Sequence, residues 1–429
     1  MPIKIIKMRR FFVFLPLLLF PFMLGAQETI TVMQYNLLQY GNYQSGFAEC
    51  FETNNNTQRK DECIRTLLDY VKPDIFTVCE FGSKPQLQVD FMRHNLNVGD
   101  INYWKTDNAI NYANSSIINH IFYDSRKMEL KKHVALRTSP RDTDVYELYL
   151  KTPELLAGDT IKLVCIVSHP KAGQSYEVDR LATMSMVMNY VEAHYANENV
   201  LIMGDFNMYR ASESGYQLLT RTYSHNESLF VDPLARTGGV GEWNNNPQFA
   251  PFHTQSTRRY SNECFSSGGL DDRFDFILMS DEIYMGFNKI KYINNSYYAV
   301  GNDGNHFDQS IDQNGNSSVP PEVAEALFDA SDHLPVTMTL SVYAQWDVEE
   351  IGARDFKVYP NPTNGVITVE TVQDEATEYR ITNVLGQTLM TGTFNNQTGQ
   401  IDVSELPDGL YIVNINGLIS KFVKATGRR

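Results

Sequence analysis

Two short strings constrain the fold and the chemistry of this chain more than any other feature. Residues 201–207 read Leu-Ile-Met-Gly-Asp-Phe-Asn, and residues 331–336 read Ser-Asp-His-Leu-Pro-Val. Each string places acid, amide or imidazole groups beside an apolar run that is typical of a β-strand. Because a core does not need these polar groups, we expect distant strand ends to converge on a preorganised site for a metal ion and a phosphate.

The N-terminal segment predicts export. Basic residues precede an apolar run at 11–24, and Leu24-Gly25-Ala26 offers a small-residue cleavage site. The run is shorter than the about 20 residues that a membrane span needs, and it contains Pro16 and Pro21. We therefore predict a signal peptide over 1–26 and no stable membrane span, with a retained anchor as the alternative.

Charge and length limit the classes of function. The 429 residues carry a formal net charge of −15, which repels polyphosphates at long range and disfavours a tight, salt-sensitive nucleic-acid binder. An enzyme that touches phosphate through metal ions stays compatible with this charge. The length predicts two domains plus processed segments, and an apolar content of 42% suffices for a sizeable core.

The five cysteines allow disulfides in an exported protein. Cys50 and Cys63 flank an Asn-rich loop and could staple it, whereas Cys79 and Cys165 lie in apolar strand-like runs and are expected to be buried thiols. The odd count leaves at least one cysteine unpaired, and the sequence alone does not determine the connectivity.

Residues 27–345 alternate β-type runs with helices and long polar loops. Helices are predicted over Arg59–Val71 and Val178–His194 from their apolar spacing. Strands mixed with helices predict a layered α/β or α+β sandwich whose site lies at strand ends. The predicted strands are Ile30–Tyr35, Asp74–Cys79, Ile117–Tyr123, Val145–Leu150, Ile161–Ser168, Val200–Met203, Phe274–Met279 and Val336–Tyr343.

The composition changes near Trp346. After a linker at 346–355, residues 356–429 show short strands separated by Gly, Pro and Asn turn signals, which predicts a small all-β module. This module contains no His or Cys and no acid cluster that could chelate a metal. We therefore expect the chemistry to lie in residues 27–345.

Polar groups follow several of the predicted strands. Asn36 comes after the first and Glu80 after the second, and Mg²⁺ prefers oxygen ligands with only one or two carboxylates. A turn residue at Asn36 and a plain loop charge at Glu80 are the alternatives. His169 follows a third strand, where an imidazole can donate a proton to a leaving oxygen, or can serve only as a structural residue.

The second half of the chain adds further candidates. Asp205 and Asn207 would aim a carboxylate and an amide at one point, or form a tight Asp-Asn turn. Asp275 lies inside an apolar strand, where a buried carboxylate needs a fixed partner. His333 is the expected partner, because an acid–imidazole pair fixes the tautomer and orientation of the ring. Asp332 would then be free for a metal.

In this order, N…E…H…G-D-F-N…D…S-D-H, the residues resemble the endonuclease/exonuclease/phosphatase superfamily, also called the deoxyribonuclease I-like fold. The resemblance covers about 27–345 and implies a four-layer α/β sandwich with two packed mixed β-sheets. It also implies that Glu80 binds a divalent metal, with Asn36 and Asp332 close to it. The implied cofactor is Mg²⁺, with Mn²⁺ or Ca²⁺ as alternatives.

The same resemblance assigns the catalytic groups. It implies that Asp205 orients or deprotonates the attacking water and that Asn207 holds a phosphate oxygen. His169 and His333 would flank the scissile phosphate, with Asp275 orienting His333. The secreted deoxyribonuclease branch supports its first histidine with a second carboxylate, for which this chain offers only Asn119 as a weak candidate.

The C-terminal module resembles the sorting domain of type IX secretion cargo from Bacteroidetes. The resemblance rests on 358–362 (Val-Tyr-Pro-Asn-Pro), 383–386 (Asn-Val-Leu-Gly), Leu410-Tyr411 and the 421–424 stretch. It implies handling by the type IX machinery and a secreted or cell-surface location. A carbohydrate-binding β-sandwich is the alternative.

These inferences predict a secreted, monomeric, Mg²⁺-dependent phosphodiesterase that acts as an endonuclease on extracellular DNA. One alternative keeps the chemistry and changes the substrate to sphingomyelin or a sugar or inositol phosphate, which the acidic surface would tolerate. A non-catalytic surface protein that keeps the fold is the other alternative.

Overall fold

The structure is a computed structural model that describes most of the chain. The described residues are 28–43, 49–152, 160–220, 230–235, 237–313, 315–343, 356–371, 377–383, 387–395, 397–415 and 418–425. The predicted signal peptide at 1–26 and the predicted linker at 346–355 lie outside them. Within the described residues, none of the helices combines the length and the apolar character that crossing a bilayer requires.

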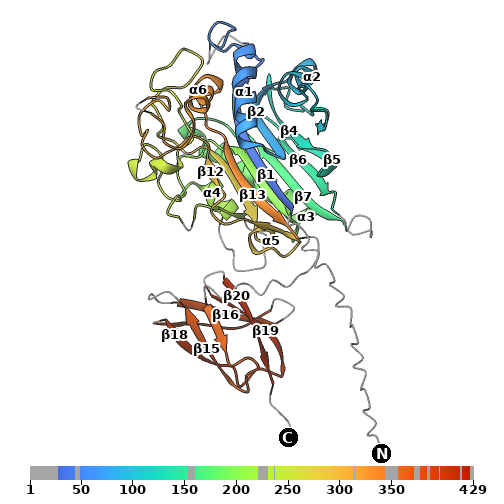
Figure 1. Cartoon of the computed structure of the whole chain (residues 1–429), viewed down its shortest axis with the longest axis vertical. Helices are drawn as coiled ribbons and strands as arrows, with labels where there is room; N and C mark the ends of the chain where they lie inside the picture. Colours follow the sequence, from blue (N-terminus) through green and yellow to red (C-terminus); the bar gives the residue numbers. More distant parts are fainter. Residues whose placement is uncertain are drawn as a thin grey trace, which may run out of the picture.

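Two mixed β-sheets form the centre of the larger body (Figure 1). In spatial order, the first sheet contains β11 (Ile290–Tyr292), β13 (Val336–Val342), β1 (Glu28–Tyr40), β2 (Ile75–Gly82), β4 (Ile117–Asp124) and β3 (Trp104–Lys105), and β12 (Tyr298–Ala299) also pairs with β13. The second contains β5 (Met128–Leu136), β6 (Thr143–Leu150), β7 (Ile161–Ser168), β8 (Val200–Asp205), β10 (Asp275–Ser280) and β9 (Phe230–Val231). The β1–β2 and β7–β8 pairs are parallel, and the other pairs are antiparallel.

Side-chain alternation explains how the sheets pack. In β8, Leu201 and Met203 join the core between the two sheets, while Val200 and Ile202 pack with a second apolar cluster that includes Met184 of a covering helix. Because successive side chains of a strand point to opposite faces, a strand buried on both faces is a continuous apolar run. Both faces of the second sheet are therefore covered at β8.

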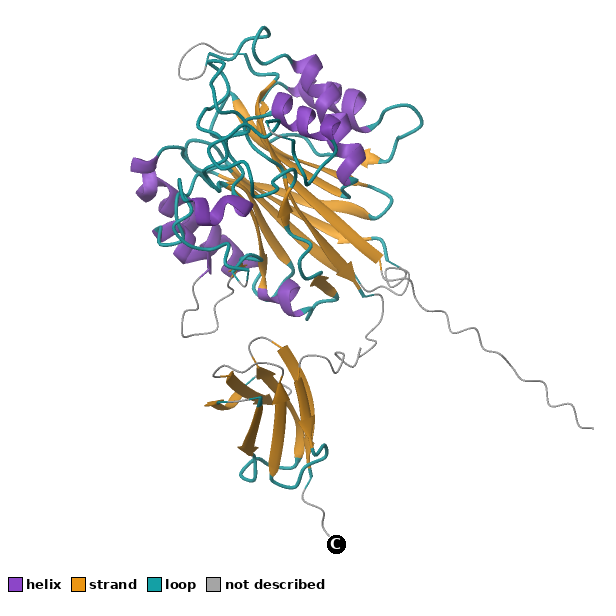
Figure 2. Cartoon of the chain, turned by 60° about the vertical axis from the view of Figure 1, so that its left-hand side comes forward, coloured by secondary structure: helices purple, strands orange, loops and turns teal. Residues whose placement is uncertain are grey.

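Helices supply the outer layers, and Figure 2 shows them gathered on two sides of the strands. The helices are α1 (Thr57–Val71), α2 (Pro85–Phe91), α3 (Glu177–His194), α4 (Ser214–Thr220), α5 (Asp281–Met285) and α6 (Pro321–Ala330). α1 and α6 contribute to the core beside the first sheet, and α3 and α4 to the cluster on the second. This arrangement confirms the predicted four-layer sandwich with two packed mixed sheets.

The disulfide differs from the one that the sequence suggested. Cys50 is bonded to Cys264, with the Cα atoms 4.6 Å apart, so the suggestion of a Cys50–Cys63 staple is wrong. Cys63 lies on the buried face of α1 and belongs to the main core, so its thiol does not face the Asn-rich loop that follows Cys50. Cys79 and Cys165 are buried free thiols, as predicted.

Residues 356–425 form a separate β structure with its own core. Three strands make one sheet and four make the other. Ile367, Val369, Ile381, Ile401 and Val413 are at the centre of its apolar cluster, which agrees with the predicted small all-β sandwich. The strands are β14 (Phe356–Tyr359), β15 (Val366–Thr371), β16 (Thr377–Asn383), β17 (Thr388–Phe394), β18 (Thr398–Asp402), β19 (Gly409–Ile415) and β20 (Leu418–Lys424).

Candidate functional site

Both sheets contribute polar residues to one buried cluster. The first sheet supplies Asn36 from β1, Glu80 from β2 and the Asp332-His333 segment that leads into β13. The second supplies His169 after β7, Asp205 at the end of β8 and Asp275 at the start of β10. Asp275 and Asp205 face each other in the β8–β10 register, which places two strand termini at the same edge.

A glycine allows the closest approach within the second sheet. Gly204 has φ 149°, and a Cβ there would lie 1.8 Å from the carbonyl oxygen of Ser168. Only glycine therefore fits against the end of β7. This contact brings Asp205 beside His169, the residue that follows Ser168.

The side chains of Asn36 and Glu80 are directed into the cluster by irregular backbone within strands, and not by the end of a strand. β1 continues through Asn36 to Tyr40, and β2 continues through Glu80 to Gly82, so the predicted strand ends at these residues are wrong. The strand register shifts in β1 between Asn36 and Tyr40, and Glu80 has φ 54°. Bulges of this kind re-aim side chains next to functional sites.

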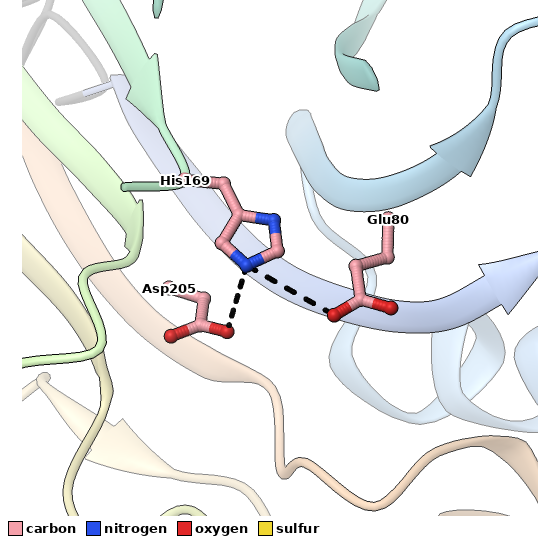
Figure 3. Close-up of side chains that lie close together, drawn as sticks. All are labelled: Glu80, His169 and Asp205. Atoms are coloured by element: carbon pink, nitrogen blue, oxygen red, sulfur yellow. Dashed lines mark ion pairs between the residues drawn. The ribbon is translucent and has the colours of Figure 1, made fainter. Parts of the chain in front are cut away.

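Glu80, His169 and Asp205 form the candidate metal group. Their carboxylate and imidazole atoms lie within 4.8 Å of one another. His169 Nε2 is 3.3 Å from Asp205 Oδ2 and 3.9 Å from Glu80 Oε1, and it points between the two acids (Figure 3). One imidazole and two carboxylates are a donor set that fits a divalent cation.

Burial sets the protonation of this group. Burial lowers the pKa of His169 well below its usual value, and the nearby Arg141 and His333 lower it further, so the ring is neutral at neutral pH. Burial raises the pKa of Asp205 to about 7, with Asp275 and Glu80 adding to the rise and His333 opposing it. The neutral imidazole of His169 can therefore bind a cation, and the Asp205 carboxylate, whose pKa is near neutral, can accept a proton or bind a cation.

Asn36 sits at the centre of the cluster and presents its amide nitrogen to it. Nδ2 is 2.9 Å from Asp205 Oδ2, 3.1 Å from Glu80 Oε1 and 3.4 Å from His333 Nε2. The amide oxygen accepts the Leu38 backbone N–H at 2.9 Å. Asn36 therefore acts as a donor in this arrangement, and its role beside a metal stays a prediction.

Asp332 lies at the edge of the cluster and outside the candidate metal group. Its Oδ2 accepts the Ser266 backbone N–H at 2.9 Å and the Gln255 amide at 3.4 Å. Its Oδ1 is buried, has no hydrogen-bond donor among the described residues, and is 4.0 Å from His333 Nε2. A buried carboxylate oxygen needs a partner, so Oδ1 suits a cation or an ordered water.

His333 and Asp275 form a close pair, with Nδ1 2.7 Å from Oδ2. Burial opposes the charged ring, but Asp275 and Asp205 outweigh it and raise the pKa of His333 well above its usual value. His333 is therefore an imidazolium at neutral pH, whereas His169 is neutral. The Gln255 side-chain amide lies 2.7 Å from His333 Nε2 and lines the same side of the cluster, and its oxygen is the atom that can accept the Nε2 proton of the charged ring.

Asn207 lies just beyond β8 in a left-handed conformation, with φ 51°. Its backbone N–H donates to Asp205 Oδ1 at 3.0 Å, so the alternative of a tight Asp-Asn turn is present. Its side-chain amide donates to the Pro170 carbonyl at 3.4 Å. Asn207 thus lies beside the His169 segment, and its contact with phosphate stays a prediction.

Arg141 is a site residue that the sequence did not reveal. Its Nε donates to the His169 carbonyl at 2.8 Å and its Nη2 to the Pro170 carbonyl at 2.7 Å. Burial lowers the pKa of Arg141, while the charges of Glu80 and Asp205 oppose that shift. A lone arginine in a polar loop has no sequence signal that would mark it.

The suggested support of His169 by Asn119 is wrong. The Asn119 amide donates to Asp142 O, Asp144 Oδ2 and Val167 O. His169 Nδ1 is buried and has no hydrogen-bond partner among the described residues.

Lys60 is a second residue that the sequence did not reveal. It lies in α1, is 1% exposed, and its Nζ donates to the Leu37 and Leu38 carbonyls at 2.7 and 2.6 Å. Burial lowers the pKa of Lys60 to about 7, although Asp332 and Glu80 oppose the shift. Lys60 therefore holds the irregular part of β1 that follows Asn36.

Solved structures similar to this chain have low sequence identity. D. rerio TDP2 complexed with a single-strand DNA product shows 12% identity and a TM-score of 0.46, covering 73% of this chain and 98% of that chain. The human Nocturnin catalytic domain shows 14% identity and a TM-score of 0.43, covering 74% of this chain and 98% of that chain. An endonuclease/exonuclease/phosphatase family protein from Bacteroides thetaiotaomicron shows 14% identity and a TM-score of 0.43, covering 74% of this chain and 99% of that chain. A search of curated protein sequences found no match.

A family model matches the C-terminal β structure. Residues 357–425 match the model described as a secretion system C-terminal sorting domain. The match agrees with the order of strands and turns that suggested a sorting domain in the sequence. The chain therefore carries a C-terminal sorting domain of the type IX secretion system and is exported, either released or attached to the cell surface.

Proposed function

We propose that the protein is a secreted, metal-dependent phosphodiesterase that cleaves DNA, with residues 27–345 as its catalytic domain. The observation that carries the proposal is the convergence of four acids, one neutral and one protonated histidine, and two amides from both sheets. The resemblance of their order to the endonuclease/exonuclease/phosphatase superfamily supports the same reading. A purely structural role would not require this cluster, because burying acids without compensation is costly.

We assign the metal to the Glu80 side of the cluster. Glu80 would hold a divalent cation, Mg²⁺ in the first instance, with His169 and Asp205 in reach and Asn36 and Asp332 nearby. When bound, such a cation polarises a phosphoryl oxygen and stabilises the charge that develops on it. The donor set fits the cation, since acids surround the position and one buried oxygen of Asp332 lacks a donor.

Asp205 and His333 would carry out the two proton transfers of the reaction. Asp205, whose pKa is near neutral, takes a proton from the attacking water as the P–O bond to that water forms. The bond to the leaving oxygen breaks, and the His333 imidazolium gives that oxygen its Nε2 proton. Asp275 holds the ring by its other nitrogen. Neutral His169 and the Asn36 and Asn207 amides would contact the phosphate oxygens.

One experiment tests the proposal against its rivals. The purified protein is incubated with plasmid DNA, sphingomyelin and a phosphomonoester, each with Mg²⁺ and with EDTA. We expect cleavage of DNA that EDTA abolishes. Metal-dependent hydrolysis of sphingomyelin or of the monoester alone would move the assignment to another substrate, and no turnover of any ester would favour a non-catalytic surface protein.

A second candidate substrate is favoured by one observation. The net charge of −15 opposes the approach of a long polyanion, but not that of a zwitterionic lipid head group or a small phosphate ester. A sphingomyelinase-like or sugar or inositol phosphate hydrolase would use the same proton transfers. The substrate panel above separates these cases.

Glu80→Gln is expected to raise the Mg²⁺ concentration for half-maximal activity by at least about tenfold, because the amide cannot supply the negative charge that a divalent cation requires. Activity on DNA is measured across a Mg²⁺ series. Glu62→Gln, a half-exposed acid on α1, is the matched control and should leave the series unchanged. If Glu80→Gln needed the same Mg²⁺ concentration for half-maximal activity as the wild type, Glu80 would not be a metal ligand.

Lys60→Met is expected to raise the same Mg²⁺ requirement, by about ten- to a hundredfold, because residues that orient metal ligands typically contribute this much. Lys60 holds the Leu37 and Leu38 carbonyls, and the adjacent Gln39 N–H donates to Glu80 Oε2 at 3.1 Å. Lys60→Arg should restore part of the affinity. A variant that only lowers the melting temperature, with an unchanged Mg²⁺ series, would make Lys60 purely structural.

A further inference from the structure

The Cys50–Cys264 disulfide joins two loops that border the catalytic cluster. Cys50 lies in the loop before α1, Cys264 lies in the long loop before β10, and the two are 214 positions apart in the sequence. The loops also exchange two hydrogen bonds, because the Asn54 amide donates to Asn262 O at 3.1 Å and the Asn262 amide donates to Asn54 O at 3.0 Å. Such hydrogen bonds replace bonds to water and contribute modestly, so the covalent bond is the main link between the loops.

The loop that contains Cys264 holds two residues of the cluster in place. The Ser266 N–H, two positions after the cysteine, donates to Asp332 Oδ2 at 2.9 Å. The Ser266 carbonyl accepts the Ser256 hydroxyl at 2.8 Å, and Ser256 follows the residue whose side-chain amide lies 2.7 Å from His333 Nε2. A displacement of Cys264 would therefore reach both Asp332 and His333.

The disulfide also packs against the part of β1 that carries Asn36. A small apolar cluster, separate from the main core, consists of Leu38, Cys50, Cys264 and Phe265. The Leu38 N–H donates to Asn36 Oδ1 at 2.9 Å and so fixes the orientation of the Asn36 amide. Four side chains bury little apolar area, so this cluster depends on the covalent bond more than the main core does.

The compartment of the protein decides when this bond can form. Disulfides form and persist in oxidising compartments and are rare in the reducing cytosol. The C-terminal sorting domain shows that the chain is exported. Before export, while the chain shares a compartment with the DNA of the cell, Cys50 and Cys264 are therefore thiols.

We propose that formation of the Cys50–Cys264 disulfide completes the catalytic cluster, so that the protein is latent before export and is activated by oxidation. The inference rests on the proposed phosphodiesterase activity and names its regulation. The two thiols lose two protons and two electrons as the S–S bond forms, and a disulfide-carrying oxidant accepts them and becomes two thiols. Because the cysteines are 0% and 5% exposed, a reductant reaches the finished bond slowly and activation is effectively one-way.

The test compares the two redox forms of one preparation. The full chain is made by cell-free synthesis in a phosphine reductant, and half of it is then treated with oxidised glutathione. Thiol titration in denaturant should count five thiols before this treatment and three after it. At a temperature at which both forms are folded, the reduced form should need about ten- to a hundredfold more Mg²⁺ for half-maximal cleavage of DNA, the usual effect of losing groups that orient metal ligands.

Cysteine variants separate the disulfide from other effects of thiol chemistry. The double variant Cys50→Ala, Cys264→Ala should behave like the reduced form and should not respond to oxidised glutathione. Cys165→Ala is the matched control, because Cys165 is a buried free thiol in the main core. This control should lower the melting temperature but keep the wild-type Mg²⁺ requirement and the wild-type response to oxidation.

Hydrogen exchange supplies a readout that requires neither metal nor activity. In EDTA, the Ser266 and Leu38 amides should exchange at least about tenfold faster in the reduced form, because local opening of the two loops releases them. The amides of Leu201 and Met203 in β8 should exchange equally in both forms. A disulfide that only stabilised the whole fold would instead change the exchange of the β8 amides as well.

The outcomes separate this inference from the proposed function. An oxidised form that cleaves no phosphate ester overturns the proposed function and the latency together. An oxidised form that cleaves DNA, with a reduced form that needs the same Mg²⁺ concentration, overturns only the latency.

Discussion

His333→Ala is expected to lower kcat on DNA by about 10²- to 10⁴-fold, the usual contribution of a positioned general acid. Asp275 and Asp205 raise the pKa of His333 well above its usual value, so the ring carries a proton that it can give to the leaving oxygen at neutral pH. Single-turnover cleavage of a labelled DNA strand at saturating Mg²⁺ measures the loss.

A second buried histidine serves as the control that separates a loss of catalysis from a loss of folding. His306 is also buried and pairs with an aspartate, with Nδ1 2.8 Å from Asp303 Oδ1, but it has no contact with the cluster. His306→Ala should lower the melting temperature and keep kcat per folded molecule. If His333→Ala retained full kcat, the leaving group would need another proton donor and the assignment of His333 would be wrong.

The strands were the most predictable part of the fold. All eight predicted strands are present, because strands such as β8 are buried on both faces and therefore appear as continuous apolar runs. β5 was missed, since its sequence Met-Glu-Leu-Lys-Lys-His-Val-Ala-Leu mixes charged residues into an exposed edge strand. α6 was missed because it follows directly on a long polar loop that ends in two prolines.

The types of site residue were predictable, but their precise geometry was not. Acids and histidines beside apolar runs mark candidate site residues, and the structure brings Asp205, His333 and Asp275 together. The bulges that aim Asn36 and Glu80 depend on contacts from α1 and on positive φ angles, which local sequence does not encode. Arg141 and the Cys50–Cys264 bond join segments far apart in sequence, so only the folded chain reveals them.

Asp205→Asn is expected to lower kcat on DNA by about 10²- to 10⁴-fold, because the amide cannot take a proton from water while its shape is kept. The substituted side chain still offers an oxygen to the Asn36 amide, which donates to Asp205 Oδ2 at 2.9 Å. The fold should therefore persist. Single-turnover cleavage at saturating Mg²⁺ measures the effect, and an unchanged kcat would require a different base.

The stability of this variant should move in the opposite direction from its activity. Burial raises the pKa of Asp205 to about 7, so the folded state resists the ionisation that the unfolded chain undergoes near pH 4. As the pH rises from about 4 through 7, the wild type loses the stability that this proton confers, and Asp205→Asn does not. At pH 8 in EDTA, the melting temperature of Asp205→Asn should therefore equal or exceed that of the wild type.

Asp232→Asn is the matched control for that comparison. Asp232 is equally buried, but it pairs with the buried Arg273 through two contacts of 2.9 and 3.0 Å. Removing its charge leaves an uncompensated guanidinium, so the melting temperature should fall while kcat per folded molecule is kept. Opposite responses of these two buried acids would mean that Asp205 is maintained for catalysis at a cost to stability. A lower melting temperature for both variants, with parallel losses of activity, would mean that Asp205 serves the fold.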